Sequence, residues 1–431
     1  MNAMRDALDR TLLLMRDELH SDVADDVLLA ALTGMEIAVV ADAETLHAPA
    51  AQTAFVTTAL LCARSGHKVH LLAPDVPLAQ PQLPLRGAAM IAALLAADGA
   101  VMPARRFESQ LPDHAIDLEI RLGASPRRCE AHATCAIGAT RWSGHLTRNA
   151  TVPWMRDLVW PMGAMAAATL GSIEAFKCAM HKLAPFARSP ELFAEFFAAL
   201  ADATLTLAPE ATPMASALGA FDIISGGAMT NGLLYGLARL PSVTGVARVV
   251  EPDIAEASNL NRYALLTIED LGKPKAERLA ALDLGGLTLK PLPWRFKSPG
   301  SIGVLAPRVL VGVDHIPTRW AVQRAMPRYL GIGATTHWSA MASCHRPGEA
   351  CAGCAHPRDD MMEGPIPTVA FVSFLAALLQ ATDFLREVAC ARAVETLAYV
   401  TALRPDRIWR TPITEHPACP VRRASSAGQS A

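Results

Sequence analysis

Residues 221–251 constrain the fold of this chain more than any other stretch. A short apolar run leads into Ser225-Gly226-Gly227, and an apolar, helix-compatible segment follows. A second run, rich in β-branched residues, ends at the acid Glu251. Strand, glycine turn, helix, strand and acid form the βαβ unit that places a phosphate at a helix N-terminus and a ribose hydroxyl on a carboxylate. The sequence therefore predicts an α/β fold built on such a unit.

The glycines of this unit leave its ligand undecided. Gly227 and Gly232 stand where a dinucleotide-binding loop would also have a middle glycine, but Met229 and Thr230 occupy the tight part of the turn. So crowded a loop suits a nicotinamide cofactor poorly. On the glycines alone, a plain βαβ core explains the segment about as well as a nucleotide site does.

Three motifs that follow Glu251 narrow the alternatives. Ser258-Asn259-Leu260-Asn261-Arg262 is followed by Gly272-Lys273-Pro274-Lys275, and then by Asp314 at the end of another predicted strand. Their order and spacing resemble the ThiF/MoeB and ubiquitin-activating enzyme family, in which S-N-L-x-R, G-x-x-K and an aspartate follow the strand-end acid. The resemblance covers about residues 220–380.

The resemblance implies two Rossmann-like, ThiF-type adenylation domains in tandem. The N-terminal half also begins with a β-α-β pattern, but its turn at 41–49 contains no glycine, and side chains there would obstruct a phosphate. We therefore expect a degenerate, inactive domain at 1–205 and an active ATP-binding domain at 206–431. A helix and a polar linker are expected at 192–212. An unrelated N-terminal α/β domain is the alternative.

The resemblance also implies roles for individual residues. Gly227 and Gly232 are expected in the nucleotide-binding site. Glu251 is expected to accept hydrogen bonds from the ribose of ATP, and Asn259, Arg262 and Lys275 to grip the phosphates. Asp314 is expected to hold Mg²⁺, which normally binds through one or two carboxylates plus phosphate oxygens and water. Arg262, Lys275 and Asp314 would be catalytic, because charge on the phosphates must be offset while an acyl-adenylate forms. Outside this ordered pattern, an arginine and a lysine here would be ordinary surface charges.

In this family an additional arginine often reaches the γ-phosphate from the N-terminal helix of the partner half. Arg5, Arg10 and Arg16 lie on a helix predicted over residues 1 to about 33, and the sequence does not select among them.

Cysteines near the C-terminus suggest a structural zinc site. Cys351 and Cys354 have zinc-knuckle spacing, and family members often carry zinc between two such pairs. The second pair is broken here, because Cys419 is kept and Arg422 stands where its partner would be. A fourth ligand could come from Cys344, His356 or His416; the alternative is a set of reduced thiols without metal.

The nucleophile of thioester-forming members is missing. They usually carry a cysteine in the loop that here spans residues 355–367, and this loop has none. Cys344, in a polar loop predicted at 344–360, is the nearest alternative, whereas Cys390 lies beyond the following helix. Three hypotheses remain: adenylation only, a thioester on Cys344, or an ester on Thr368 or Ser373. A hydroxyl would need a neighbouring base, while a thiol is intrinsically the better nucleophile.

Composition excludes several classes of partner. A formal net charge of −2 and a pI near 6.7 argue against a nucleic-acid-binding surface. The apolar stretches 158–173 and 365–382 contain prolines and fit buried helices better than membrane spans. Nine scattered cysteines suit a reducing cytoplasm, where we expect the protein. Residues 421–431 are expected to be disordered.

The resulting functional hypothesis is ATP-dependent adenylation of the C-terminus of a small ubiquitin-like, β-grasp protein, which a conjugating enzyme would then receive. One alternative is adenylation of a peptide or a sulfur-carrier C-terminus in biosynthesis; for a peptide, we expect a peptide-clamping N-terminal module. A non-catalytic scaffold of the same fold and a nicotinamide oxidoreductase are the others. The sequence does not decide whether two chains form a homodimer.

Overall fold

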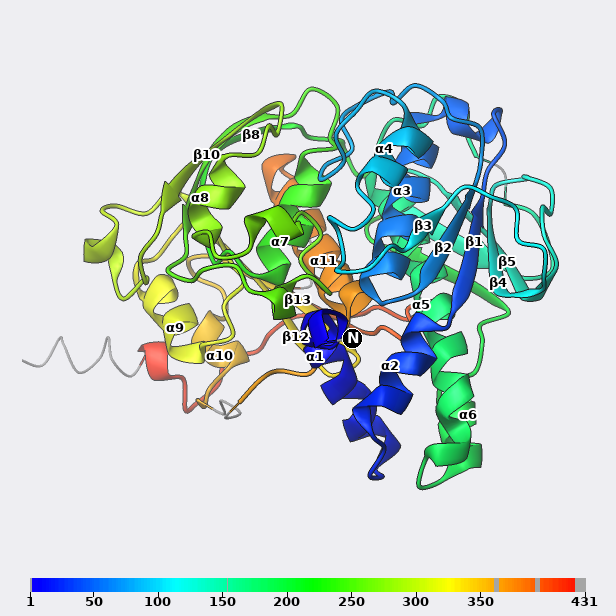
Figure 1. The fold of residues 1–431 in the computed structure, drawn as a ribbon. Coiled ribbons are helices and arrows are strands. Elements are labelled where there is room, and N and C mark those ends of the chain that lie inside the picture. The colour runs from blue at the N-terminus through cyan, green and yellow to red at the C-terminus, as the bar shows by residue number, and fades with distance from the viewer. Residues whose placement is uncertain (1, 153, 360–363, 392–395, 423–431) are drawn as a thin grey trace, which may run out of the picture.

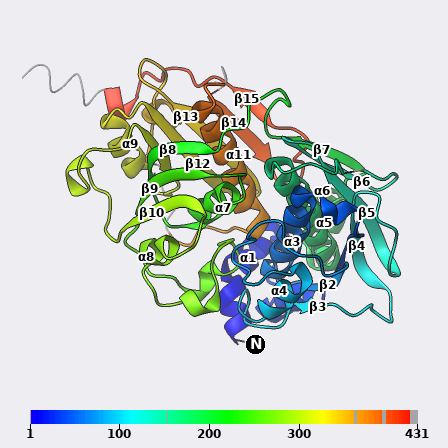
Figure 2. The same ribbon diagram turned by 90° about the horizontal axis from the view of Figure 1, so that it is seen from above.

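The computed structural model describes residues 2–152, 154–359, 364–391 and 396–422. One large sheet lies in each half of the chain, and helices lie between the two sheets (Figure 1, Figure 2). The α/β fold class with two Rossmann-like sheets is thereby confirmed.

Seven strands form the N-terminal sheet. In spatial order they are β3 (Phe107–Glu108), β2 (Lys68–Leu72), β1 (Glu36–Val40), β4 (Ile116–Leu122), β5 (Ala131–Ala139), β6 (Ser143–Thr147) and β7 (Asp202–Thr206). The strands from β3 to β5 are parallel, and the last two pairings are antiparallel.

Eight strands form the C-terminal sheet. In spatial order they are β10 (Gly286–Leu292), β9 (Thr244–Val250), β8 (Ala217–Ile224), β11 (Arg308–Val311), β12 (Tyr329–Thr336), β13 (Ser339–His345), β14 (Leu397–Thr401) and β15 (Trp409–Thr411). The first five are again parallel and the rest antiparallel. Counted along each half, the first seven strands follow the same order, 3-2-1-4-5-6-7, in both sheets, and β15 adds an eighth strand to the C-terminal one. This agreement is expected for a duplicated fold.

The inner, parallel strands are continuous apolar runs in the sequence. The strands β1 and β11 (Glu-Ile-Ala-Val-Val and Arg-Val-Leu-Val) are buried almost throughout, as strands covered on both faces must be.

Eleven α-helices lie in the described residues: α1 (Asn2–Leu19), α2 (Asp25–Thr33), α3 (Pro49–Arg64), α4 (Met90–Ala96), α5 (Met162–Leu183), α6 (Pro190–Phe196), α7 (Ala228–Leu237), α8 (Lys275–Ala280), α9 (Ile316–Arg324), α10 (Ala352–Ala355) and α11 (Ala370–Val388). Among these residues, no helix combines the length and apolar character that a bilayer span requires.

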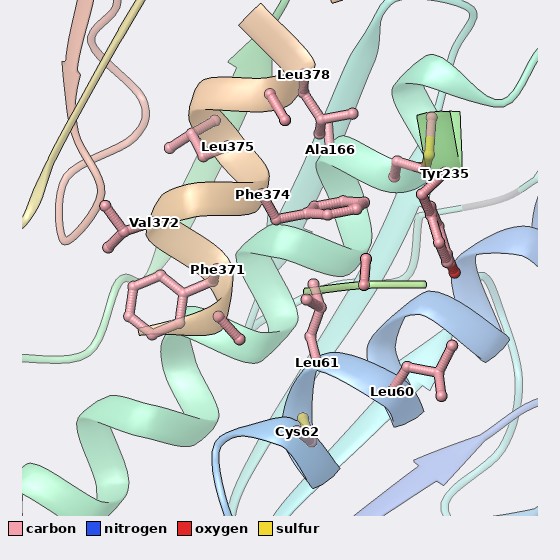
Figure 3. Packing of buried hydrophobic residues seen from close by; sticks show 14 of the residues in the cluster. Leu60, Leu61, Cys62, Ala166, Tyr235, Phe371, Val372, Phe374, Leu375 and Leu378 are labelled. Atoms are coloured by element: carbon pink, nitrogen blue, oxygen red, sulfur yellow. The ribbon is translucent and has the colours of Figure 1, made fainter. Parts of the chain in front are cut away.

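The helices α3, α5, α7 and α11 form the layer between the sheets and are buried on nearly every side. Figure 3 shows the centre of this layer, where Leu61 of α3, Tyr235 of α7 and Phe374 of α11 approach one another. The Tyr235 and Phe374 rings meet edge to face at 5.4 Å, and the Tyr235 hydroxyl lies 2.7 Å from Oγ1 of Thr57. One hydrophobic core therefore runs through both halves.

The observed elements differ from the predicted ones in three places. At 192–212 the expected helix is present as α6, but strand β7 takes the place of the polar linker, so a boundary after residue 205 falls inside the last strand of the N-terminal sheet. Cys344, expected in a loop, lies in β13. The continuous N-terminal helix is divided into α1 and α2. The tail expected to be disordered lies outside the described residues from 423 onward, as do residues 360–363 of the loop before α11.

Candidate active site

The carboxyl ends of β8, β9 and β11 surround one cavity. Strands β9 and β11 lie on opposite sides of β8, and open α/β sheets bind ligands at such a switch point. The cavity has a volume of about 440 Å³. Its charged and aromatic lining includes Arg10, Glu251, Asp253, Arg262, Tyr263, Lys275, Arg295, Phe296 and Asp314.

The turn after β8 is held by Glu251 and by its own helix. Gly226 N donates to Oε2 of Glu251 at 2.5 Å. Oγ1 of Thr230 donates to Ser225 O at 2.8 Å, and Nδ2 of Asn231 donates to Gly226 O at 3.1 Å. A Cβ on Gly226 would lie 2.6 Å from Cγ of Glu251, so this position requires glycine. Thr230, expected to crowd the turn, braces it.

Glu251 lies at the edge of the cavity with only 7% of its surface exposed. Burial raises the pKa of its carboxyl, although the N–H groups of Gly226 and Asp253 act in the opposite direction. Oε1 accepts from Asp253 N at 3.1 Å. Each carboxylate oxygen can accept a second hydrogen bond, so the group can still bind a ribose hydroxyl. Gly227 lines the same cavity and begins α7, whose N-terminus suits a phosphate.

Arg262 and Tyr263 enter the cavity from a segment that α1 supports. The Arg262 guanidinium donates to Ser258 O and, at 2.8 Å, to Oδ1 of Asn261. Asn261 is fully buried and donates through Nδ2 to Oγ1 of Thr11 at 2.9 Å. The fork of Arg262 is thus oriented before any ligand binds.

Lys275 is the first residue of α8 and also lines the cavity. Its Nζ is 3.4 Å from Oδ2 of Asp253 and 5.6 Å from the centroid of the Tyr263 ring. Burial lowers its pKa, but Tyr263, Glu251 and Asp253 together raise it, and the net shift is upward. The ammonium is therefore charged at neutral pH.

Asp314 follows β11 and is exposed to the cavity. The surrounding protein raises the pKa of its carboxyl by desolvation, against the nearby guanidinium groups of Arg319, Arg262 and Arg10. Within the described chain, no hydrogen bond or ion pair occupies its oxygens. A carboxylate facing a cavity of this kind fits Mg²⁺, which prefers hard oxygen ligands.

Among the three N-terminal arginines, the structure brings only Arg10 to the cavity. Its Nε and Nη1 atoms are buried without a hydrogen-bond partner in the described chain. Arg5 and Arg16 instead form ion pairs with Asp25 of α2. Arg10 is therefore the candidate for the additional phosphate-binding arginine.

We expect Arg10→Ala to weaken ATP binding by about 10–100-fold, because a charge-assisted hydrogen bond to a phosphate contributes about 1.5–3 kcal/mol. Arg5→Ala is the matched control, because it removes an arginine of the same helix that forms only an exposed ion pair. It should change the affinity for ATP less than about twofold. Isothermal titration of both variants with ATP and Mg²⁺ measures the difference. Equal affinities would exclude Arg10 from the site.

Two predicted ligands lie outside the cavity. The side chain of Asn259 closes a capping box with Glu256 at the 3₁₀ turn Ala257–Asn259, its Oδ1 accepting from Glu256 N at 3.0 Å. It shapes the segment before Arg262. Gly232 lies in α7, where a Cβ would be 2.6 Å from Cβ of Ala377, so it serves helix packing. Neither residue is among those that line the cavity, and their phosphate and cofactor roles stay predictions.

Sequence reasoning missed Asp253, Tyr263, Arg295 and Phe296. The first two adjoin recognised motifs, and Asp253 stands two residues after Glu251. The other two follow β10, whose carboxyl end lies at the same sheet edge as that of β9. Because the residues after β10 must lie at the same sheet edge as those after β9, the sequence could have indicated that Arg295 and Phe296 lie near the site.

The corresponding edge of the N-terminal sheet differs chemically. Ala73 directly follows β2, as Glu251 follows β9, and Ser125 stands three residues after β4, as Asp314 does after β11. A recess of about 460 Å³ there has Asp42 and Arg128 as its charged lining residues. Most of the cavity's cations have no counterpart there.

The structure argues against Cys344 as a nucleophile. Its side chain is 2% exposed in β13 and does not line the cavity, and burial raises the pKa of its thiol to about 12. Thr368 and Ser373 do line the cavity, with their hydroxyl oxygens 3.2 Å apart. No described histidine or carboxylate makes a hydrogen bond to either hydroxyl.

Cys351, Cys354 and Cys419 come together away from the cavity. Sγ of Cys351 lies 3.7 Å from that of Cys354 and 3.3 Å from that of Cys419, and all three are buried. Three convergent sulfurs fit a tetrahedral zinc ion. No fourth histidine, cysteine or carboxylate joins the group within the described ranges, and His416 instead accepts from Ala418 N.

If the three thiols hold zinc, purified protein should contain one zinc per chain, and Cys354→Ser should lose it. Cys390→Ser removes an exposed thiol outside the group and is the matched control. Elemental analysis with thiol titration distinguishes the alternatives: three thiols that are all reactive in native, metal-free protein would contradict the zinc site.

Comparison with known proteins gives two kinds of match. The BilD N-terminal domain family matches residues 36–193. An uncharacterized protein of Sinorhizobium fredii, y4jF, is 30% identical over 231 residues, which are 52% of this chain and 44% of that protein. The sulfur carrier protein adenylyltransferase of Thermus thermophilus is 36% identical over 143 residues, 29% of this chain and 52% of that enzyme. The chain thus aligns with about half the length of these curated relatives.

Solved structures with similar architecture include E. coli MccB with AMPCPP and MccA, at 16% identity and a TM-score of 0.41, covering 67% of this chain and 97% of that one. Another is PaaA, at 12% identity and a TM-score of 0.37, covering 46% and 65%. These scores are too low to support a functional comparison. Among the sequence relatives, the Thermus thermophilus adenylyltransferase shows that part of this chain is similar in sequence to an adenylating enzyme.

Proposed function

We propose that this chain uses ATP to adenylate the C-terminal carboxylate of a small carrier protein or peptide. The observation that supports this is the cavity itself, where Arg10, Arg262 and Lys275 lie around Asp314 at the switch point of the sheet. Fixed cations in a recess of this kind offset the charge of a triphosphate and of its transition state.

In the proposed reaction, a carboxylate oxygen of the substrate attacks the α-phosphorus of ATP. A new phosphorus–oxygen bond forms, the bond to the bridging oxygen breaks, and pyrophosphate leaves with the electron pair. Arg10, Arg262 and Lys275 would hold the phosphates in line for attack, and Glu251 would accept from the ribose. Asp314 would hold Mg²⁺, which supplies positive charge at the phosphate oxygens when bound.

An apolar wall completes the proposed nucleotide site. Ile224, Val250 and Phe296 line the same cavity and belong to one hydrophobic cluster. A flat base can pack against such a surface, while its sugar and phosphates reach the polar side of the cavity.

The relatives favour a carrier-type substrate. The Thermus thermophilus enzyme acts, by its name, on a sulfur carrier protein, and its identity with this chain is 36% over the aligned residues. A sulfur-carrier protein or a peptide is therefore the substrate class that we propose first.

A ubiquitin-like substrate is the second candidate, and one observation favours it. The N-terminal half contains a sheet of the same strand order as the C-terminal half, whereas peptide adenylation led us to expect a peptide-clamping module there. In this reading the activated protein would pass to a conjugating enzyme. The cavity wall has no cysteine among its described residues, so we propose that chemistry in it ends at the adenylate.

ATP–pyrophosphate exchange tests the proposal. Purified protein would be assayed with a sulfur-carrier protein, a ubiquitin-like protein and a short peptide, each intact and with its last two residues removed. Exchange that requires one intact C-terminus identifies the substrate class. Absence of exchange with every partner, together with absence of ATP binding, would refute adenylation and favour a scaffold.

A further inference from the structure

Two buried arginines, one in each half of the chain, donate hydrogen bonds to the other half. Arg64 ends α3 in the N-terminal half and donates to three carbonyl oxygens of the C-terminal half. Arg239, just beyond α7, donates to Oε1 of Gln82 at 2.9 Å and to Leu83 O at 2.7 Å in the N-terminal half. Both side chains are almost completely buried.

The contacts of Arg64 converge on one short segment. Nη1 donates to Leu260 O at 2.5 Å, while Nη2 donates to Leu266 O at 2.6 Å and to Ala264 O at 3.3 Å. No carboxylate forms an ion pair with this guanidinium in the described chain. Burying a cation costs free energy unless the cation is hydrogen-bonded. The hydrogen bonds to these carbonyl groups offset the cost of burying the Arg64 guanidinium. In return, the planar fork fixes both ends of residues 260–266 relative to α3.

That segment carries two residues of the cavity, Arg262 and Tyr263. The guanidinium of Arg262 is oriented by Ser258 and Asn261, but its backbone position depends on where residues 260–266 lie. Catalytic geometry tolerates little displacement, since a shift of about 1 Å can cost roughly 10²-fold in rate.

We propose that Arg64 is a positioning residue for the nucleotide site: it fixes residues 260–266, and so Arg262, against the N-terminal half. The inference rests on the proposed function, because it assumes that the cavity binds ATP. It gives the N-terminal half a role in that site, although that half has no comparable set of cations at its own sheet edge.

Arg239 provides a matched control. It makes the equivalent crossing from α7, is equally buried, and holds a segment that does not line the cavity. Loss of either guanidinium should destabilise the fold to a similar degree, because each leaves buried carbonyl groups unpaired. Only loss of Arg64 should also disturb the site.

The test compares Arg64→Met, Arg64→Lys and Arg239→Met in the full chain. Thermal unfolding and the affinity for ATP with Mg²⁺, measured by isothermal titration, are read separately. We expect similar losses of thermal stability for the two methionine variants, about tenfold weaker ATP binding for Arg64→Met, and less than twofold change for Arg239→Met.

Other outcomes overturn the inference. If Arg64→Met and Arg239→Met bind ATP equally well, Arg64 has only a structural role. If Arg64→Met does not fold, Arg64→Lys decides: it retains a charge but cannot span three carbonyl groups, so wild-type affinity would refute positioning. If the wild-type chain itself binds no ATP, the proposed function fails and the inference fails with it.

Discussion

Asp314→Asn is expected to reduce ATP–pyrophosphate exchange by about 10²–10³-fold, the range for losing one preorganised electrostatic group. The amide keeps the size of the side chain but removes its negative charge. Because the Asp314 oxygens face the cavity and make no hydrogen bond within the described residues, folding should be unaffected. The exchange that remains should require a higher Mg²⁺ concentration, since the proposed metal ligand is weakened.

Asp253→Asn makes the same chemical change in the same cavity. Asp253 is exposed and its carboxylate lies near Lys275, at 3.4 Å. We expect a loss of less than about tenfold and an unchanged Mg²⁺ requirement, because the carboxylate of this pair is exposed to solvent and a solvated ion pair contributes about 0–1 kcal/mol. Should both variants lose activity equally and need the same Mg²⁺, Asp314 would not be the metal ligand.

Gly226→Ala is expected to destabilise the fold by roughly 2–5 kcal/mol and to abolish measurable ATP binding. The new Cβ would lie 2.6 Å from Cγ of Glu251 and 3.1 Å from Cβ of Lys275, and both are buried residues of the cavity. Overpacking costs about 1–3 kcal/mol. Displacement of Glu251 would also break its hydrogen bond from Gly226 N, at a similar cost for an unsatisfied buried group.

Two other glycines separate the causes. Gly227→Ala places a Cβ 3.3 Å from Oγ of Ser225 and 3.5 Å from the Tyr263 hydroxyl, at an ordinary φ of −78°, so it should be tolerated. Gly232→Ala brings α7 and α11 into conflict away from the cavity and should lower stability while ATP still binds. Calorimetric unfolding and ATP titration of the three variants check this order; wild-type ATP binding by Gly226→Ala would contradict it.

Local patterns accounted for much of the fold. The strands that flank α3 and α7 were predictable because buried parallel strands are continuous apolar runs, and glycine or charged residues mark their ends. Strand β7 was not predictable. Its burial alternates, and it pairs with β6, which lies more than fifty residues earlier, so only tertiary pairing distinguishes it from a polar linker.

The site was predictable where motif order carried the information. Glu251, Arg262, Lys275 and Asp314 all reach one cavity. The choice among Arg5, Arg10 and Arg16 was not predictable, since all three are arginines on one helix. It depends on Asp25, which pairs with the other two from a second helix. The capping role of Asn259 was not predictable either, because a capping side chain and a phosphate ligand have the same sequence signature.

The shared strand order of the two halves has a genetic consequence. In an assembly of two identical subunits, every substitution appears on both sides of the symmetry axis. Here each half is encoded by its own codons, so a substitution alters one half only. Ala73, for example, stands after β2 at the position that Glu251 occupies after β9. One side can then keep most of the nucleotide-binding residues while the other diverges, provided that the diverging side preserves the common core, Arg10 and the arginine that crosses between the halves.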